Sequence, residues 1–350
     1  MTIEALTHDA TDNTASVAIG GDATGKNLLS MSQLGEADIF DYLDEAYAAE
    51  TLVKDPFRRG ALVLPFAVMK AVMRQPSTRT GGSCTTAMQK LGGSADLISG
   101  MESSSEAKEE SPEDTWVAFA TQTDILGIRS SENKEPEMAA KVIARARHLG
   151  QLTREVPVIN LGDGTNEHPT QGLGDMFTIH KNFRRFEGLI TAVVGDQERY
   201  RAHHSFMLGA AILGMNVIAV ESDISRVPSY ISEAMGPRLQ TTTDINEALA
   251  AADVLYLGRN PKEYGGKDPV ELERTERLSE IYAGWTLSPD RLKLMSPKAI
   301  VMHPRPRNSE LPTCVDEDSR MRDVQQMDNM IPMRMAIFAR HLGASIKEFV

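Results

Sequence analysis

The 350-residue sequence has few cysteines and no long apolar run. Its two cysteines, Cys84 and Cys314, are too few for a disulfide scaffold and lie too far apart for a Cys-x-x-Cys motif. No apolar stretch reaches the roughly 18–20 residues that a membrane-spanning helix needs. Residues 1–25 lack the basic start and the apolar core of a secretory signal. We therefore expect a cytoplasmic protein with no membrane segment.

Basic residues are also scarce. Lys and Arg total 37 against 49 Asp and Glu, which gives a formal net charge of −12. This excess of negative charge disfavours a nucleic-acid-binding protein and a protein that binds an anionic membrane surface. An acidic protein that binds an anionic small molecule must gather its basic side chains locally. The positions of the arginines are therefore informative.

The rest of the composition is typical of a folded α/β protein. Apolar residues make up 41% and charged residues 25% of the chain, as in ordinary globular domains, and the length suggests two domains. Short apolar runs alternate with helical segments, which predicts two doubly wound domains with parallel sheets covered by helices. The polar residues 1–25 predict a flexible tail, and we place the domain boundary near the helix that follows His168. Strands are expected at residues 60–69, 94–98, 124–128, 156–161, 189–194, 216–220, 253–257 and 299–302, and helices at 38–51, 83–91, 112–120, 135–149, 204–213 and 245–251.

A cluster of hydroxyl side chains stands at the entrance to one expected helix. Ser77, Thr78 and Thr80 surround Arg79, and two glycines follow. Backbone N–H groups at a helix N-terminus bind anions, and hydroxyls and a guanidinium add further donors. This pattern indicates a phosphate site, although a simple capped helix start would use the same residue types.

Two further loops follow apolar runs. The loop 162–171 is rich in glycine and ends in His168, which can polarise a carbonyl, and Gln171, whose amide both donates and accepts. The alternative for this loop is ordinary turn and cap chemistry. The segment 195–205 has the position of a dinucleotide loop but lacks G-x-G-x-x-G, which disfavours a nicotinamide enzyme. Its two adjacent histidines do not share a helix face and have no evident third ligand, so we expect no metal.

Several arginines lie near the ends of expected strands. Because ligands of parallel sheets bind beyond the carboxyl ends of the strands, these side chains predict a site for two anions, one phosphate-like and one carboxylate-like. No Ser-His-Asp or Cys-His arrangement offers a clear nucleophile, which favours direct transfer over a covalent intermediate. The arginines are Arg79, Arg129, Arg201, Arg259, Arg305 and Arg307.

These motifs together resemble the aspartate/ornithine carbamoyltransferases. The resemblance covers about residues 26–350, and its second half is similar to the aspartate branch of the family. It implies transfer of the carbamoyl group of carbamoyl phosphate to the α-amine of L-aspartate, which gives N-carbamoyl-L-aspartate and phosphate in pyrimidine synthesis, with no metal or organic cofactor. The matching motifs are Ser77-Thr78-Arg79-Thr80, His168-Pro169-Thr170-Gln171, Gly195-Asp196 with Arg201 and His204-Ser205, and His303-Pro304-x-Pro306-Arg307.

The resemblance also implies a role for each matched residue. The phosphate would be held by Ser77, Thr78, Arg79 and Thr80, and the carbonyl would be polarised by Thr80, Arg129 and His168. The carbamoyl NH2 would be held by Gln171 and the backbone of Pro304 and Arg305. The carboxylates of the acceptor would be bound by Arg201 and Arg259.

Assembly is implied by resemblance as well. Residues 103–108 are similar to a mobile loop that reaches into the neighbouring subunit's site, so Lys108 would act on catalysis and aspartate binding in a homotrimer with shared active sites. By itself this stretch indicates only a charged, flexible loop. Residues 326–350 resemble the family's closing helix, which would complete a carbamoyl phosphate-binding domain at 26–167 and leave 168–325 to bind the amino acid. The attachment of a regulatory chain or of pathway enzymes stays open.

The sequence departs from the family pattern around the acceptor. Pro261 stands where Gln is usual, Tyr264 where Arg is usual, Gly81 where Arg is usual, Arg305 where Leu is usual, and Glu109 where Gly is common. We hypothesise that Arg305 replaces a lost carboxylate contact. The alternatives are a carbamoyltransferase for another amino acid or amine, a non-catalytic homologue that binds anions or a partner, and, at the level of the fold, a dehydrogenase.

Overall fold

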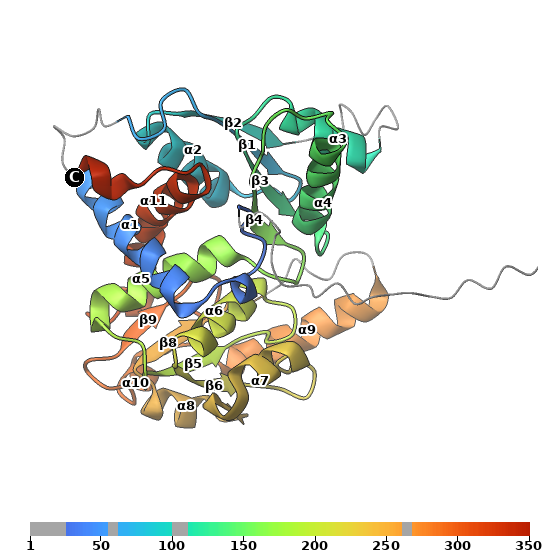
Figure 1. Cartoon of the computed structure of the whole chain (residues 1–350). Coiled ribbons are helices and arrows are strands. Elements are labelled where there is room, and N and C mark those ends of the chain that lie inside the picture. The colour runs from blue at the N-terminus through green and yellow to red at the C-terminus, as the bar shows by residue number, and fades with distance from the viewer. Residues whose placement is uncertain (1–25, 55–61, 100–110, 261–267) are drawn as a thin grey trace, which may run out of the picture.

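The computed structural model describes residues 26–54, 62–99, 111–260 and 268–350. It has two lobes, each built on a parallel sheet covered by helices (Figure 1), which confirms the expected fold class. The first sheet has the strand order β2-β1-β3-β4 and the second the order β7-β6-β5-β8-β9. The first sheet comprises β1 (Val68–Met73), β2 (Ser94–Ser99), β3 (Ile125–Ser130) and β4 (Val158–Asp163). The second comprises β5 (Ile190–Val194), β6 (Asn216–Val220), β7 (Leu239–Thr242), β8 (Val254–Leu257) and β9 (Ile300–Met302).

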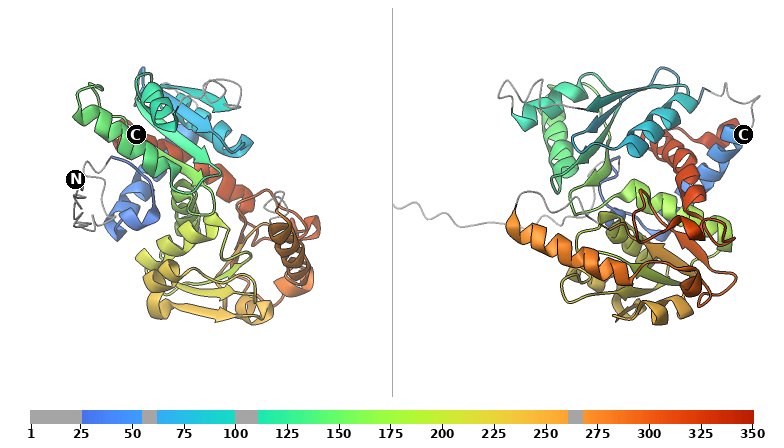
Figure 2. Two further views of the ribbon diagram at one scale, coloured as in Figure 1. Left: turned by 90° about the vertical axis from the view of Figure 1, so that its right-hand side faces the viewer. Right: turned by 180° about the vertical axis from the view of Figure 1, so that it is seen from behind.

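The helices lie on both faces of each sheet, and two further views separate the lobes (Figure 2). The inner strand β8 is buried along its whole length because helices cover both faces of its sheet, which explains its continuous apolar sequence VLYL. The helices are α1 (Glu36–Lys54), α2 (Thr78–Lys90), α3 (Pro112–Ala120), α4 (Glu135–His148), α5 (Pro169–Phe183), α6 (Arg201–Ile212), α7 (Ser229–Met235), α8 (Ile245–Ala251), α9 (Pro269–Gly284), α10 (Pro289–Leu292) and α11 (Asp323–His341), with 3-10 turns η1 (Met31–Gln33), η4 (Gly236–Arg238), η5 (Thr313–Val315) and η6 (Ile346–Phe349).

The last long helix returns to the first lobe, as the resemblance predicts. α11 packs against α1, α2 and α5. The Tyr42 hydroxyl and the His341 Nε2 atom lie 2.8 Å apart, and the Asn329 amide donates to the Thr178 hydroxyl at 2.8 Å. One apolar cluster includes buried side chains of α1, α5 and α11 together with strands of both sheets. The two lobes therefore share a core around α5 and α11.

Two expectations about the elements are wrong in detail. The strand expected at 60–69 begins only at Val68 and runs to Met73; of its residues, 60 and 61 lie outside the described part. Leu62 and Phe66 are exposed, and Pro65 has no N–H to donate to a ladder, so this apolar stretch is a turn. The helix expected at 83–91 begins at Thr78, because the Ser77 hydroxyl caps it.

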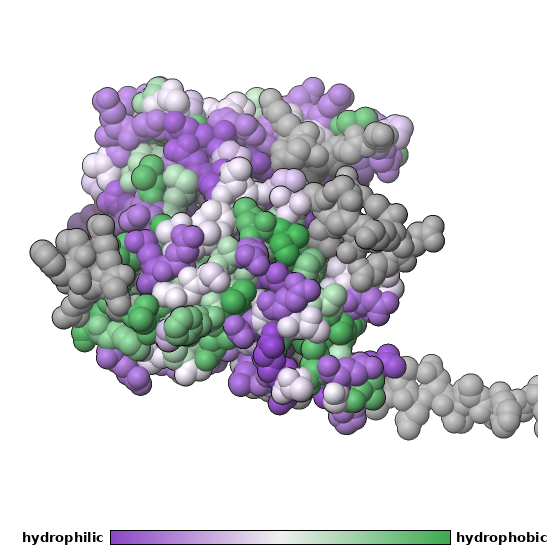
Figure 3. Space-filling model, turned by 90° about the horizontal axis from the view of Figure 1, so that it is seen from above, coloured by the Kyte–Doolittle hydropathy of each residue, from purple (hydrophilic) through white to green (hydrophobic). Residues whose placement is uncertain are grey.

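Several elements of the second lobe have no counterpart in the sequence-based prediction. β7 is an edge strand with the polar sequence LQTT, and α9 buries only Thr275, Leu278 and Tyr282. Neither has the apolar periodicity by which a buried element is recognised. None of the helices within the described ranges is long and apolar enough to cross a membrane. Polar groups cover most of the molecule's upper face, between scattered apolar patches (Figure 3).

Candidate active site

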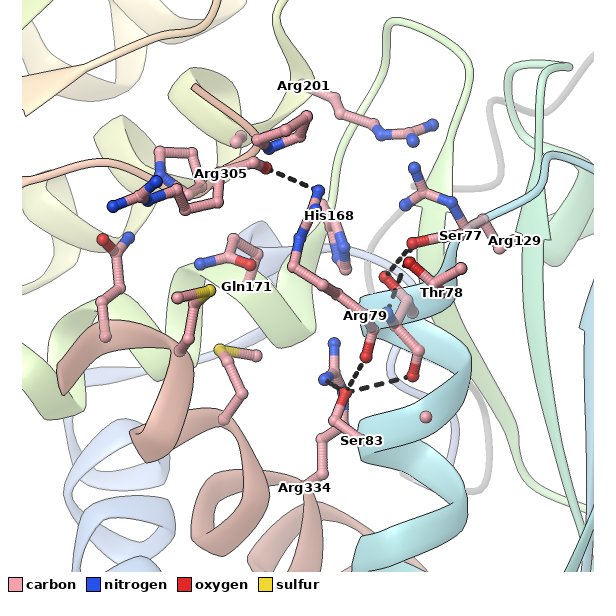
Figure 4. Close-up of a pocket in the computed structure, with 18 of the residues that line it drawn as sticks. Ser77, Thr78, Arg79, Ser83, Arg129, His168, Gln171, Arg201, Arg305 and Arg334 are labelled. Carbon is pink, nitrogen blue, oxygen red and sulfur yellow. Dashed lines mark hydrogen bonds between the residues drawn. The ribbon is translucent and has the colours of Figure 1, made fainter. Parts of the chain in front are cut away.

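A cavity of about 720 Å³ opens where the carboxyl ends of the two sheets face each other. Its walls come from both lobes and from α11 (Figure 4). Among the described residues that line it, none is Asp or Glu. The cavity is therefore a basic site in an acidic protein, as the two-anion prediction requires. Its arginines are Arg79, Arg129, Arg201, Arg259, Arg305 and Arg334.

The N-terminal end of α2 forms one wall. Ser77 is the N-cap, and its hydroxyl accepts from the Thr80 N–H at 3.3 Å and bonds the Thr80 hydroxyl at 3.0 Å. The backbone N–H groups of a first helical turn have no intrahelical acceptor, and here Thr78 and Arg79 belong to that turn. Backbone donors, hydroxyls and a guanidinium therefore converge on one point, which suits a phosphate group.

Arg129 reaches the cavity from the end of β3. The pairing of β3 with β4 shifts register between Ile128 and Ser130, and such an irregularity re-aims the side chain within it. The Arg129 Nη1 atom donates to the Leu161 carbonyl at 3.2 Å. Gly162 has a φ of 111°, and a Cβ there would lie 2.9 Å from Arg129 Nη1 and 3.0 Å from Arg201 Nε. Glycine at 162 thus lets two guanidinium groups approach the chain.

His168 precedes α5 and is buried. Its N–H donates to the Ser205 hydroxyl at 2.8 Å, and its Nδ1 atom lies 3.3 Å from the Thr170 hydroxyl. Burial, and then the charges of nearby arginines, hold the pKa of His168 well below its usual range. The imidazole is therefore neutral. The contact between Thr170 and Nδ1 is compatible with the tautomer that carries its ring proton on Nε2, where that proton can hydrogen-bond a carbonyl oxygen.

Gln171 lies one turn further along α5. Its Nε2 atom donates to Asp175 Oδ1 at 2.7 Å, which leaves Oε1 as the acceptor for a ligand NH2 group. Asp175 also accepts from the Tyr256 hydroxyl and from Gln326 Nε2, both at 2.6 Å. Burial raises the pKa of Asp175 to about 7. This buried carboxyl group orients Gln171 and joins α5 to β8 and α11.

Arg201 stands at the start of α6 and crosses between the lobes. Its Nη2 atom donates to Gln75 Oε1 at 2.6 Å, and Nη1 donates to the carbonyls of Ser130 and Gly164 at 3.3 and 3.2 Å. Arg259 follows β8 and lines the same cavity. Both arginines therefore belong to the second lobe and line the same cavity as the N-terminal end of α2.

The loop after β9 is held by a buried network. The His303 N–H donates to Gln326 Oε1 at 2.8 Å, and His303 Nε2 lies 3.1 Å from Glu310 Oε1. The Arg305 N–H donates to His303 Nδ1 at 2.9 Å, and the Arg305 carbonyl accepts from Arg79 Nη2 at 2.8 Å. The backbone of this loop thus faces the phosphate-type subsite.

The side chains of Arg305 and Arg307 make contacts other than those we expect from the sequence. Arg305 forms an ion pair with Asp323, to which its Nε donates at 2.7 Å. Arg307 is paired with Asp316 and is not part of the cavity wall. Because Asp323 already neutralises the Arg305 guanidinium, the structure argues against our hypothesis that Arg305 replaces a lost carboxylate contact. Arg307 likewise does not join the basic cluster.

The structure brings together nearly all the residues singled out from the sequence. Lys108, Glu109, Pro261 and Tyr264 lie outside the described residues. Gly81 packs against the edge strand β2, since a Cβ there would lie 2.7 Å from Leu97 Cδ1. The predicted site residues that line this same cavity are Ser77, Thr78, Arg79, Thr80, Arg129, His168, Gln171, Arg201, Arg259, Pro304 and Arg305.

Other lining residues had no role assigned from the sequence. Gln75 holds Arg201, and it lies two residues before the hydroxyl cluster. Tyr200, Gln326 and Arg334 also line the cavity. The two α11 residues lie more than 150 positions from His168, so no local pattern connects them to the site.

Within the described ranges, no group of three or more His, Cys, Asp or Glu side chains is placed to hold a metal ion. The two adjacent histidines of α6 have separate environments. His204 contacts the carbonyls of Asn166 and Gln197 at 2.7 and 2.9 Å, whereas His203 packs edge-on against Tyr200 and Tyr256.

Two family models match the chain. Residues 26–181 match the carbamoyl-P binding domain of the aspartate/ornithine carbamoyltransferases, and residues 187–341 match their Asp/Orn binding domain. The two matches follow each other in the order of the two lobes.

Relatives and solved structures agree with these matches. The aspartate carbamoyltransferase catalytic subunits of Methanocaldococcus jannaschii and Thermococcus gammatolerans are 32% and 31% identical, over 90% and 92% of this chain and 97% and 99% of their own. Aspartate transcarbamoylase from Trypanosoma cruzi in complex with carbamoyl phosphate is similar with a TM-score of 0.80 at 29% identity, over 90% of this chain and 96% of that one. The catalytic subunit of the M. jannaschii enzyme has a TM-score of 0.75 at 31% identity, over 90% and 97% of the two chains. The resemblance inferred from the motifs is thereby confirmed: the chain belongs to the aspartate/ornithine carbamoyltransferase family.

Proposed function

We propose that this protein transfers the carbamoyl group of carbamoyl phosphate to the α-amine of L-aspartate, which gives N-carbamoyl-L-aspartate and phosphate. This reaction is a step of pyrimidine biosynthesis. One observation carries the proposal: a single cavity joins a phosphate-type helix end, a neutral histidine, a glutamine and two arginines of the second lobe. Those groups suit the two anionic substrates and the carbonyl between them.

Carbamoyl phosphate binds groups of both lobes in this proposal. The α2 end with Ser77, Thr78 and Arg79 takes the phosphate oxygens. Gln171 Oε1 and the backbone of the loop at 304–305 accept from the carbamoyl NH2 group. The Arg305 carbonyl already accepts from Arg79, so this guanidinium links the phosphate subsite to the NH2 subsite.

The chemistry is acyl transfer at the carbamoyl carbon. The neutral α-amine attacks, a C–N bond forms, and negative charge builds on the carbonyl oxygen. Thr80, Arg129 and the Nε2–H of His168 stabilise that oxygen, because donors fixed before the reaction lower the energy of the developing charge. The bond from carbon to the phosphate oxygen then breaks, the nitrogen loses a proton, and phosphate leaves.

Arg201 and Arg259 bind the two carboxylates of the acceptor. Arg201 is the better defined, since Gln75 and two carbonyls hold its guanidinium at the junction of the lobes. A second candidate function keeps carbamoyl phosphate but uses another amino acid or amine. One observation favours it: Asp323 holds the Arg305 guanidinium, so Arg305 adds no free charge to the acceptor side.

We also propose the assembly that the resemblance implies. Residues 26–167, completed by 326–350, would form the carbamoyl phosphate-binding domain, and 168–325 the acceptor-binding domain. The protein would be a homotrimer in which Lys108 serves the neighbouring subunit's site. The packing of α11 on α1 and α2 supports the domain division.

The test is product formation from carbamoyl phosphate with L-aspartate, beside L-ornithine and a panel of other amines. We expect carbamoyl-aspartate, and a fall in kcat of about 10²–10³-fold in His168→Ala, the size seen when an oxyanion donor is removed. Arg79→Ala should lose activity as well. Turnover with another amine but not with aspartate would establish the second candidate, and no turnover with any amine would refute carbamoyl transfer.

A further inference from the structure

Arg334 is a buried arginine that the mechanism above leaves without a task. It lies on α11, is only 2% exposed and lines the cavity beside the first turns of α2 (Figure 4). Its Nη1 atom donates a hydrogen bond to the Ser83 hydroxyl. The final helix of the chain thus contacts the helix that carries the hydroxyl cluster.

Ser83 connects Arg334 to the first turn of α2. The Ser83 hydroxyl bonds the carbonyl of Arg79 at 2.5 Å and that of Thr80 at 3.1 Å. A hydroxyl can donate its proton to a carbonyl while its lone pairs accept from another donor. Arg334 therefore fixes, through one hydroxyl, the turn whose backbone and side chains face the phosphate.

The charge of Arg334 has no counter-ion in the described part of the chain. Among the described residues, Cys84 is the one ionisable group that favours the charged form of Arg334, and Arg129 also lies close to that thiol. The charge of Arg334 also disfavours protonation of His168. The Arg334 Nε atom is buried without a hydrogen-bond partner among the described residues. Burying such a charge is unfavourable unless something pairs with it.

Packing alone gives no reason for this charge. The same helix buries Met330, Met333 and Ile337, so an apolar side chain at 334 would suit its surroundings. The cavity that Arg334 lines has the hydroxyl cluster on its wall and no described carboxylate. A bound anion is therefore the group that can balance the charge.

We propose that Arg334 is a positioning residue of the phosphate subsite, and that the bound phosphate group is its missing counter-charge. The inference rests on the proposed function, in which the α2 end binds the phosphate of carbamoyl phosphate. Arg334 acts through Ser83 on the geometry of the turn and through its charge on the bound anion.

The test measures binding of inorganic phosphate by calorimetry, without any acceptor. Arg334→Met keeps a long side chain but removes its charge. Arg334→Lys keeps the charge but loses the planar guanidinium group with its several donors. Ser83→Ala removes the hydroxyl that connects Arg334 to the first turn of α2. Arg340→Met is the matched control, because Arg340 is on the same helix but pairs with Asp38 and Asp41. We expect phosphate affinity to fall at least about tenfold in Arg334→Met and about threefold in Arg334→Lys and Ser83→Ala, and to stay unchanged in the control.

A second readout separates positioning from simple structural support. Without ligand, Arg334→Met should melt at the same temperature as the wild type or higher, because it removes an unbalanced buried charge. Its phosphate-induced rise in Tm should shrink, since that rise follows affinity. A residue that only supports the fold would give a lower Tm without ligand and an undiminished rise with phosphate.

Either of two results overturns the proposal: wild-type phosphate affinity in Arg334→Met or in Ser83→Ala, or the Tm pattern of a purely supporting residue. Failure of the proposed function is seen separately. A wild-type protein that binds phosphate but carbamoylates no amine refutes the function and leaves the Arg334 test valid. A wild-type protein that binds no phosphate overturns both.

Discussion

Asp175 shows at the scale of one residue how the site is held. All three of its hydrogen-bond partners are uncharged: the Tyr256 hydroxyl on Oδ2, and the amides of Gln171 and Gln326 on Oδ1. Burial of the carboxyl group is the largest cause of its raised pKa, about 7. A carboxyl group whose pKa lies near neutral pH is thus placed directly behind the proposed carbamoyl subsite.

This raised pKa makes stability depend on pH. Between about pH 4 and pH 7 the folded state holds a proton that the unfolded state has released, so stability falls as pH rises through that window. Asp175→Asn should fit the same partners, because its Oδ1 accepts from both amides and its Nδ2 donates to the Tyr256 oxygen. Relative to Asp175→Asn, the wild type should lose on the order of 2–3 kcal/mol of unfolding free energy between pH 5 and pH 8. Chemical denaturation at the two pH values measures this difference.

The control is Asp328→Asn, a change of the same kind at an exposed position of α11. Its stability difference from the wild type should be equal at both pH values. Burial also raises the pKa of Glu167, to about 6, but that group is present in all three proteins and cancels in the comparison. A pH-independent difference for Asp175→Asn would contradict the assignment.

Which site residues can be predicted from sequence follows from where they lie. Arg129 lies at the end of β3, and His168 and Arg259 lie in the loops that follow β4 and β8, so the rule for parallel sheets places them at the site. Gly162 and Arg334 depend on contacts between segments that are distant in sequence. The close approach of two guanidiniums to Gly162, and the aim of a helix side chain at Ser83, exist only once the chain has folded.

At the scale of elements, the end of β8 is set by a fit between a glycine and an imidazole. A Cβ on Gly258 would lie 2.5 Å from His203 Nε2 and 3.2 Å from Tyr200 Cδ1. His203 is fully buried, neither of its ring nitrogens has a hydrogen-bond partner among the described residues, and burial holds its pKa well below the usual range. The neutral ring of His203 therefore fills the space beside Gly258, the residue that precedes Arg259.

Gly258→Ala should cost about 1–3 kcal/mol of unfolding free energy, the usual cost of overpacking. His203→Ala removes the clashing ring and leaves no buried partner unsatisfied. In the double variant the cost should be smaller than the sum of the two single costs, because the two changes act on the same space. Denaturation of the four proteins of this cycle measures the interaction.

The matched control is Gly284→Ala in the last turn of α9, where an added Cβ would meet nothing within 4 Å. It should be nearly neutral. Additive costs in the cycle, or a Gly258→Ala protein as stable as Gly284→Ala, would show that the fit between Gly258 and His203 does not set the end of β8.

Elements are predictable to the extent that they are buried in a regular pattern. β3, β4 and β5 are largely buried, each begins with an apolar residue run or alternation that the sequence shows, and they lie close to where we expect them. α9 is largely polar because one side of it faces solvent, and its neighbours supply few apolar contacts to reveal it. The apolar run before β1 predicts a buried strand, but Leu62 and Phe66 are exposed in a turn. Here an apolar sequence occurs without burial.

At the scale of the whole molecule, hydrogen bonds across the cavity join the two lobes. Arg79 of the first lobe donates to the Arg305 carbonyl of the second, and Arg201 of the second donates to Gln75 of the first. Alternation of strands and helices predicts the two lobes but not these bonds, because they depend on how the lobes meet. Both arginines, to which we assign substrate binding in the proposed function, therefore also join the lobes.

The same scale includes the proposed trimer with shared sites. If Lys108 serves the neighbouring subunit, a Lys108→Ala chain keeps an intact cavity but gives its neighbour an inactive loop, and a His168→Ala chain does the reverse. Each protein alone should be nearly inactive. After dissociation and reassembly of an equal mixture, about one site in four should combine an intact cavity with an intact loop, so roughly a quarter of wild-type activity should return.

The control mixture is Arg79→Ala with His168→Ala. Both residues line the cavity of a single chain, so no combination of these subunits contains an intact site and activity should not return. Recovery must therefore depend on which pair is mixed, not on mixing as such. If the Lys108 mixture stays inactive while sedimentation shows mixed trimers, Lys108 acts within its own subunit and the shared site is wrong. If sedimentation shows only monomers that are fully active, the trimer is not needed and the site within one chain is sufficient.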